Sequence, residues 1–95
     1  MKVIRAYFEL KQVNKKPVYL FKNGAFYLAL NDDALFLKDM GFRNKIITFG
    51  SYDIKMGFPV SEREKLERIL KEDHIEFMFI DDYKPMDYNQ YIIGG

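Results

Sequence analysis

Apolar residues recur every three or four positions in two segments of the chain, residues 2–13 and 61–72. This spacing places them on one face of an α-helix and predicts two amphipathic helices. The apolar face of the first helix consists of Val3, Ala6, Tyr7, Leu10 and Val13. Asn14 and Pro17 are expected to end it, because proline disfavours helical geometry in the residue before it.

Capping signals add a third, shorter helix at residues 33–40. Asn31 or Asp32 is expected to cap it, since short polar side chains satisfy the free N–H groups of a first helical turn. Ser61 and Glu64 have the spacing of a capping box, which predicts that the serine caps the last helix.

Five short apolar segments predict β-strands. They are residues 17–22, 26–30, 45–49, 52–58 and 75–80. The dipeptide Asn23-Gly24, which tight hairpins favour, joins the first two. The last strand, IEFMFI, is apolar enough to be expected at the centre of the sheet and not at its edge.

The resulting order, α-β-β-α-β-β-α-β, predicts an α+β domain with a single mixed β-sheet and helices packed on it. Residues 1–95 are expected to form one domain with an irregular tail at 83–95. This tail carries three tyrosines and two isoleucines, so we expect it to pack on the sheet or to form a contact surface.

Composition agrees with a globular domain, because 48% of the 95 residues are hydrophobic and 31% are charged. No run of apolar residues approaches the length of a membrane span, and the N-terminus has no signal-peptide pattern. There are no cysteines, which excludes disulfides and thiolate metal sites. We therefore expect a cytoplasmic protein with no membrane contact.

Charge is distributed unevenly although the net charge is only +1. Residues 1–24 carry six basic groups against one acidic group, whereas residues 59–95 carry five basic and nine acidic groups. A basic quarter of this kind can face nucleic acid. The alternative is an ordinary solvated surface.

Residues that carry enzymatic chemistry are scarce. The single histidine, His74, follows a helix end, where capping or solvent contact explains it. Asp81, Asp82 and Asp87 offer the oxygen atoms that divalent cations favour, but no further ligands follow at a recognisable spacing. No phosphate-binding glycine loop occurs. The sequence therefore predicts no enzyme, no metal or other cofactor and no small-molecule substrate.

Residues 20–27, L-F-K-N-G-A-F-Y, resemble the segment L-F-x-x-G-D-F-Y-E of the MutS mismatch-repair proteins. The likeness continues at Tyr7 with Leu10-Lys11, at Asp33-Ala34 and at Gly57-Phe58-Pro59. It spans roughly residues 5–82 and covers only the N-terminal mismatch-recognition domain of that family. The resemblance implies the fold of that domain.

The resemblance also implies a role for Phe26, which occupies the position of the family's wedge phenylalanine. That ring enters the minor groove and stacks on a mispaired base, at a cost of unstacking that a mispair lowers. Two residues depart from the family. Ala25 replaces an aspartate, and Leu28 replaces the glutamate that hydrogen-bonds the mispaired base. Leucine can make no such bond. The structural alternative for Phe26 is a buried strand residue.

These observations together predict a non-enzymatic module without ATPase activity that binds mispaired or distorted duplex nucleic acid, with DNA expected over RNA. Phe26 is the expected wedge and Tyr27 its neighbour. The remaining candidate contacts are Lys22, Asn23, Lys2, Arg5, Lys11, Lys15 and Lys16. The alternative is a protein-interaction adaptor that uses the acidic residues 62–82 and the tail. Its partner would be a larger repair or reverse-transcription protein, as for the MutS-like accessory proteins of diversity-generating retroelements.

Overall fold

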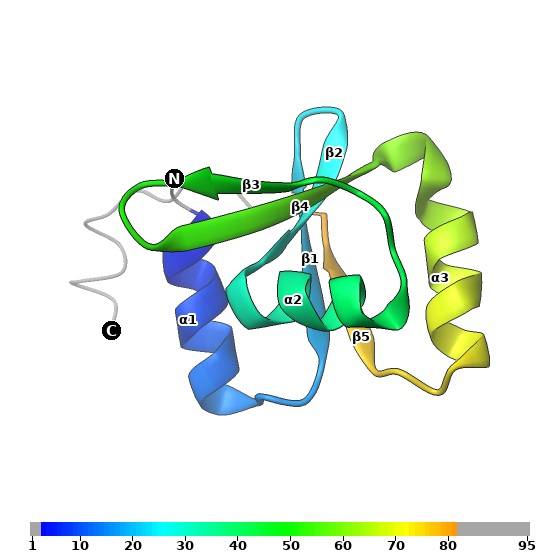
Figure 1. Ribbon diagram of the computed structural model, residues 1–95. Coiled ribbons are helices and arrows are strands. Elements are labelled where there is room, and N and C mark those ends of the chain that lie inside the picture. The colour runs from blue at the N-terminus through cyan, green and yellow to red at the C-terminus, as the bar shows by residue number, and fades with distance from the viewer. Residues whose placement is uncertain (1–2, 82–95) are drawn as a thin grey trace.

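The structure is a computed structural model, and it describes residues 3–81 (Figure 1). Its helices are α1 (Val3–Val13), α2 (Asn31–Met40) and α3 (Arg63–Glu72), with a short 3-10 helix, η1 (Val60–Glu62), before the last. Its strands are β1 (Val18–Asn23), β2 (Phe26–Leu30), β3 (Ile46–Phe49), β4 (Asp53–Pro59) and β5 (Phe77–Ile80). The predicted order of elements and the α+β class are confirmed. Lys2 and the tail at 83–95 lie outside the described residues.

The five strands form one mixed sheet in the order β3-β4-β2-β1-β5. β1 pairs with β5 in parallel, and the other neighbours are antiparallel. The prediction of β5 as a central strand is wrong, because among the described strands it has β1 as its only neighbour. Its apolar side chains are explained by partial burial against the core, since Phe77 and Phe79 pack on the cluster beneath α3.

Two clusters of buried side chains cover the two faces of the sheet. On one face, Val3, Ala6 and Tyr7 of α1 pack on alternate residues of the central strands, which are Tyr19, Phe21, Leu28 and Leu30. On the other face, α2 and α3 pack on the intervening residues. Figure 1 shows α1 and α3 on opposite sides of the sheet. Because alternate residues of a strand point to opposite faces, this division fixes where each side chain of the β1–β2 hairpin lies.

Both predicted caps are wrong. α2 begins at Asn31, two residues earlier than predicted. Its capping position is therefore Leu30, which forms no side-chain cap hydrogen bond. Asn31 instead binds β4, because its side chain accepts from the Ile54 N–H at 2.9 Å. Ser61 lies inside η1, so α3 starts after it with no side-chain cap.

Candidate nucleic-acid interface

The β1–β2 hairpin turns on two residues, Gly24 and Ala25. Gly24 has a φ of +63°, which lies in the left-handed region that glycine adopts without strain. Ala25 does not have a positive φ. This combination is typical of a type II′ turn, which has glycine at its first central position. The turn is therefore Gly24-Ala25, one residue later than the predicted Asn23-Gly24. The first residue of η1 holds the turn in place, because the Val60 N–H donates to the Ala25 carbonyl at 2.9 Å.

Phe26 is the first residue of β2 and is 47% exposed. Its ring leans across the neighbouring strand over Gly57 of β4, where an added Cβ would lie 3.4 Å from a ring carbon. A Cβ at position 57 would be in van der Waals contact with this ring. One side of the Phe26 ring thus rests on backbone, while the remainder faces solvent, so the alternative of a buried strand phenylalanine does not describe it.

Tyr27 points to the opposite face and is 3% exposed. Its hydroxyl donates to Asp81 Oδ1 at 2.5 Å and accepts from Arg63 Nη1 at 2.7 Å. Arg63 in turn contacts Asp81 Oδ2 at 2.5 Å and lies 4.4 Å from the centre of the Phe79 ring. Tyr27 is therefore a buried member of a polar cluster with Arg63 and Asp81, and it offers almost no exposed area to a nucleic acid.

Two hydrogen bonds, first from the Tyr27 hydroxyl and then from Arg63, hold the pKa of Asp81 below its usual range. Lys22 pairs with Tyr27 and so lies on the same face of the hairpin, and its charge acts in the same direction. Burial raises the pKa of the Tyr27 hydroxyl. Arg63 is not among the contact residues predicted from the sequence, because its partners Tyr27 and Asp81 are 36 and 18 residues away along the chain.

The lowered pKa of Asp81 predicts a specific acid dependence of stability. The stabilisation is complete above the carboxyl pKa of the unfolded chain, near 4, and is lost as the pH falls through the lower pKa of the folded state. We expect the wild type to be more stable than Asp81→Asn at pH 6, and the two unfolding free energies to converge toward pH 2. Urea titrations across this range measure the difference. Asp39→Asn, at an exposed carboxylate of α2, is the control, and an equal convergence for it would contradict the assignment.

The side chain of Lys11 also interacts with other groups of the protein. Its ammonium group contacts Asp33 Oδ1 of α2 at 2.5 Å, and it donates to the carbonyls of Lys15 and Pro17 at 3.0 and 2.7 Å. The other oxygen of Asp33 accepts from the Tyr19 N–H at 3.0 Å. Burial raises the pKa of Asp33, against the opposing effects of Lys11 and this N–H. With its side chain 16% exposed, Lys11 holds its ammonium group against partners within the protein.

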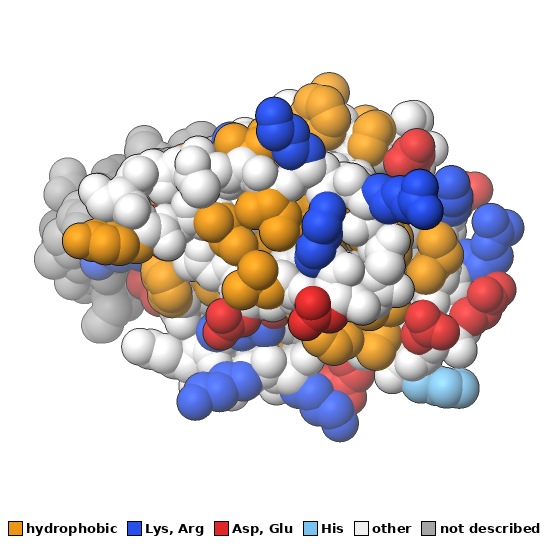
Figure 2. Space-filling model, in the orientation of Figure 1, with side chains coloured by type: hydrophobic (Ala, Val, Ile, Leu, Met, Phe, Trp, Pro, Cys, Tyr) orange, Lys and Arg blue, Asp and Glu red, His pale blue; other side chains and the backbone are white. Residues whose placement is uncertain are grey.

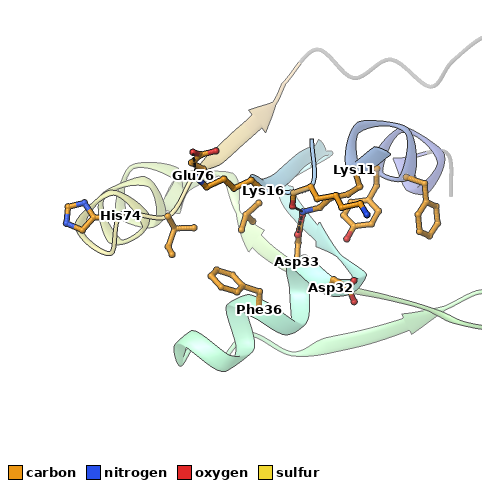
Figure 3. A pocket seen from close by; sticks show the side chains of 12 residues that line it. Lys11, Lys16, Asp32, Asp33, Phe36, His74 and Glu76 are labelled. Carbon is orange, nitrogen blue, oxygen red and sulfur yellow. Dashed lines mark hydrogen bonds and ion pairs between the residues drawn. The ribbon is translucent and has the colours of Figure 1, made fainter. Parts of the chain in front are cut away.

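Lys15 and Lys16 lie at the end of the sheet opposite the hairpin turn. They precede β1, whose six residues separate its two ends by about 17 Å. There they line a pocket of about 540 Å³ between α1, α2 and the chain before β5. Figure 3 shows Lys16 beside Glu76, with which it forms an exposed ion pair at 3.3 Å, and Lys11 reaching Asp33. The structure therefore groups Lys11, Lys15 and Lys16 around this pocket. Lys22 lies at the opposite end of β1, so these three lysines and the hairpin tip do not form one patch.

Of the remaining candidates, Arg5 forms an exposed ion pair with Glu9 on α1 at 3.6 Å. His74 is exposed at the edge of the same pocket. Within residues 3–81 no group of acidic, histidine or cysteine side chains is placed to hold a metal ion. No helix in that range is long and apolar enough to span a membrane.

The hairpin tip consequently retains three of the predicted contact residues, Lys22, Asn23 and Phe26, all exposed. Lys22 lies on one face of the hairpin, and Asn23 and Phe26 lie on the other. Comparison of the chain with known protein families and with curated proteins gave no match. The resemblance to MutS therefore stays a prediction.

Proposed function

We propose that this chain is a non-enzymatic cytoplasmic module that binds mispaired or otherwise distorted duplex DNA by inserting Phe26 at a weakened base step. The observation that carries the proposal is the half-exposed Phe26 ring, which stands at the tip of a two-residue hairpin and rests on Gly57. A larger repair or reverse-transcription protein would be its further partner.

The hairpin is suited to this task for two reasons. Its tip is narrow, because Gly24 and Ala25 carry little or no side chain, and so the Phe26 ring projects beside them. Its ring is also supported on one side, which limits the conformational freedom lost on insertion. Apolar wedges of this kind unstack a base step from the minor groove, and a mispair lowers the cost of unstacking. Duplex DNA is favoured because the minor groove of RNA is wide and shallow.

Phe26→Ala is expected to weaken binding to a mispaired duplex by about 1–3 kcal/mol, the range for an aromatic ring stacked on a base. The loss of folding stability should stay below the roughly 3–5 kcal/mol of a buried phenylalanine. Fluorescence anisotropy with mispaired and matched duplexes at two salt concentrations measures the affinity, and thermal unfolding measures the stability.

Phe8→Ala is the matched control, because Phe8 is 50% exposed but lies on α1, away from the hairpin tip. Its removal should leave the affinity unchanged. The proposal fails if the wild type binds neither duplex, or if Phe26→Ala binds both as tightly as the wild type does.

One observation favours the adaptor as a second candidate function. Phe8, Leu35, Phe36 and Tyr52 are between 40% and 95% exposed, and three of them line a pocket of about 420 Å³ between α1, α2 and the β3–β4 turn. Exposed apolar groups of this kind mark protein contacts. On the face shown in Figure 2, basic and acidic side chains also alternate without a continuous basic area. Loss of partner binding in Phe8→Ala but not in Phe26→Ala would support the adaptor.

A further inference from the structure

We infer that Asn23 is the residue that contacts the base edge beside the inserted ring and so sets the preference for particular mispairs. The inference rests on the proposed function, since it assigns a second residue of the same site. It follows from the strand register, the exposure of the side chains around Phe26 and the chemistry of the amide group.

The register places Asn23 directly opposite Phe26. The two are the last paired residues of the β1–β2 ladder, Asn23↔Phe26. Residues directly opposite in an antiparallel pair point to the same face, with Cβ atoms about 4.5–5.5 Å apart. The Asn23 amide therefore lies next to the Phe26 ring, on the face of the sheet that α1 covers further down.

The amide of Asn23 is available for a ligand. Asn23 is exposed, and within residues 3–81 its side chain has no hydrogen-bond partner. Toward the described part of the chain, its carbonyl acceptor and its two N–H donors are therefore unused.

Neighbouring positions cannot take this role. Leu28, two residues along the same face, is apolar and only 6% exposed. Ala25 has no polar side-chain atom. Lys22 pairs with Tyr27, so it lies on the opposite face, where its charge lowers the pKa of Asp81. Among the described residues of the hairpin tip, Asn23 alone combines a polar side chain with the face of Phe26.

The amide suits the chemistry of the minor groove. Adenine N3 and thymine O2 present acceptors there, to which an amide N–H can donate. Guanine adds an N–H₂ donor, from which the amide oxygen can accept. Asparagine is among the side chains that read this groove in proteins that insert apolar wedges. An amide beside the wedge would therefore contact the base that the ring displaces, and a mispaired base presents its edge most freely.

The experiment compares wild type, Asn23→Ala, Asn23→Asp and Lys22→Ala on matched duplexes and on duplexes with a mispair that contains or lacks guanine. The measured quantity is the ratio of affinities for mispaired and matched DNA. Asn23→Ala should reduce this ratio by about fivefold to tenfold, as expected for one lost hydrogen bond. The slope of log affinity against log salt should be the same for Asn23→Ala as for the wild type, because no phosphate contact is removed.

The two other variants separate base contact from charge. Lys22→Ala should lower the slope of log affinity against log salt by about one and leave the ratio unchanged. Asn23→Asp can only accept hydrogen bonds, so it should lose more affinity for mispairs without guanine than for those with it. Neither position has a left-handed backbone, so the variants should fold, which their melting temperatures check.

An unchanged ratio in Asn23→Ala, together with loss of binding in Phe26→Ala, would overturn the role of Asn23 and leave the proposed function standing. A wild type that binds no duplex would overturn both. A reduced ratio in Asn23→Ala with an unchanged salt slope supports the inference.

Discussion

Leu28→Glu is expected to destabilise the protein by about 3–4 kcal/mol at pH 7. The position lies beneath α1, where Leu28 is 6% exposed and packs in the cluster with Phe21 and Tyr7. Burial can raise the pKa of a glutamate by about 3–5 pK units, so the folded variant would hold the side chain protonated at pH 7. The cost is then that of protonating a group with an ordinary pKa near 4.3, about 3.7 kcal/mol at about 1.4 kcal/mol per unit. Because small domains are stable by only about 5–15 kcal/mol, the variant should lose a large part of its stability at neutral pH.

The same variant should recover stability in acid. A raised pKa in the folded state means that the penalty is absent below the pKa of the unfolded glutamate, near 4.3, and grows as the pH rises toward the folded value. Circular dichroism melts at pH 4 and pH 7 test this. Ala25→Glu is the control, since it adds the same carboxylate at an exposed position of the same hairpin and should change stability by about 0.5 kcal/mol or less. A Leu28→Glu variant with an unaltered melt at pH 7 would contradict the burial.

Leu28 also limits what the resemblance to MutS implies. In that family the corresponding glutamate hydrogen-bonds the mispaired base, which requires a carboxylate that solvent or DNA can reach. In this chain α1 covers position 28, so neither solvent nor DNA can reach a side chain there. A glutamate at position 28 would therefore destabilise the hydrophobic core before any contact with a base could be measured. Under our inference, Asn23 makes the polar contact at the hairpin tip instead.

The order of helices and strands was predictable from the sequence because it depends on local signals. The 3–4 spacing of Val3, Ala6 and Tyr7 and the Gly24 turn act within a few residues, and both are present in the structure. The position of β5 was not predictable in this way. A short apolar strand is expected both at the centre of a sheet and at an edge packed under a helix, and only the pairing of β5 with β1 decides between them.

The site was predictable only in part, for the same reason. Strand alternation places Phe26 and Tyr27 on opposite faces, but both faces are covered further along the hairpin. Phe26 is exposed because it is the first residue of β2, at the hairpin tip. The partners of the charged groups do not follow from the sequence, because Tyr27 meets Asp81 across 54 residues and Lys11 meets Asp33 across 22. From the sequence alone, a lysine near a helix end is expected on the surface, and only the folded structure shows that a carboxylate lies beside it.

The structure predicts that Lys11→Met destabilises the fold by about 3–5 kcal/mol, the cost of removing one partner of a buried ion pair. Methionine keeps much of the length of the lysine stem, so the change isolates the ammonium group. That group contacts Asp33 Oδ1 at 2.5 Å and donates to two carbonyls where α1 leads into β1. Its removal leaves a carboxylate that is 6% exposed without its counter-ion.

Lys16→Met is the control, because Lys16 forms its ion pair with Glu76 at 3.3 Å on the surface, where the two side chains are 75% and 51% exposed. Exposed pairs contribute about 0–1 kcal/mol, so this variant should unfold at nearly the urea concentration of the wild type. The double variant Lys11→Met, Asp33→Asn should be more stable than Lys11→Met alone, since the amide can still accept from the Tyr19 N–H without a buried charge. Equal losses in Lys11→Met and Lys16→Met would mean that Lys11 is a surface lysine after all, and would return it to the candidate phosphate contacts.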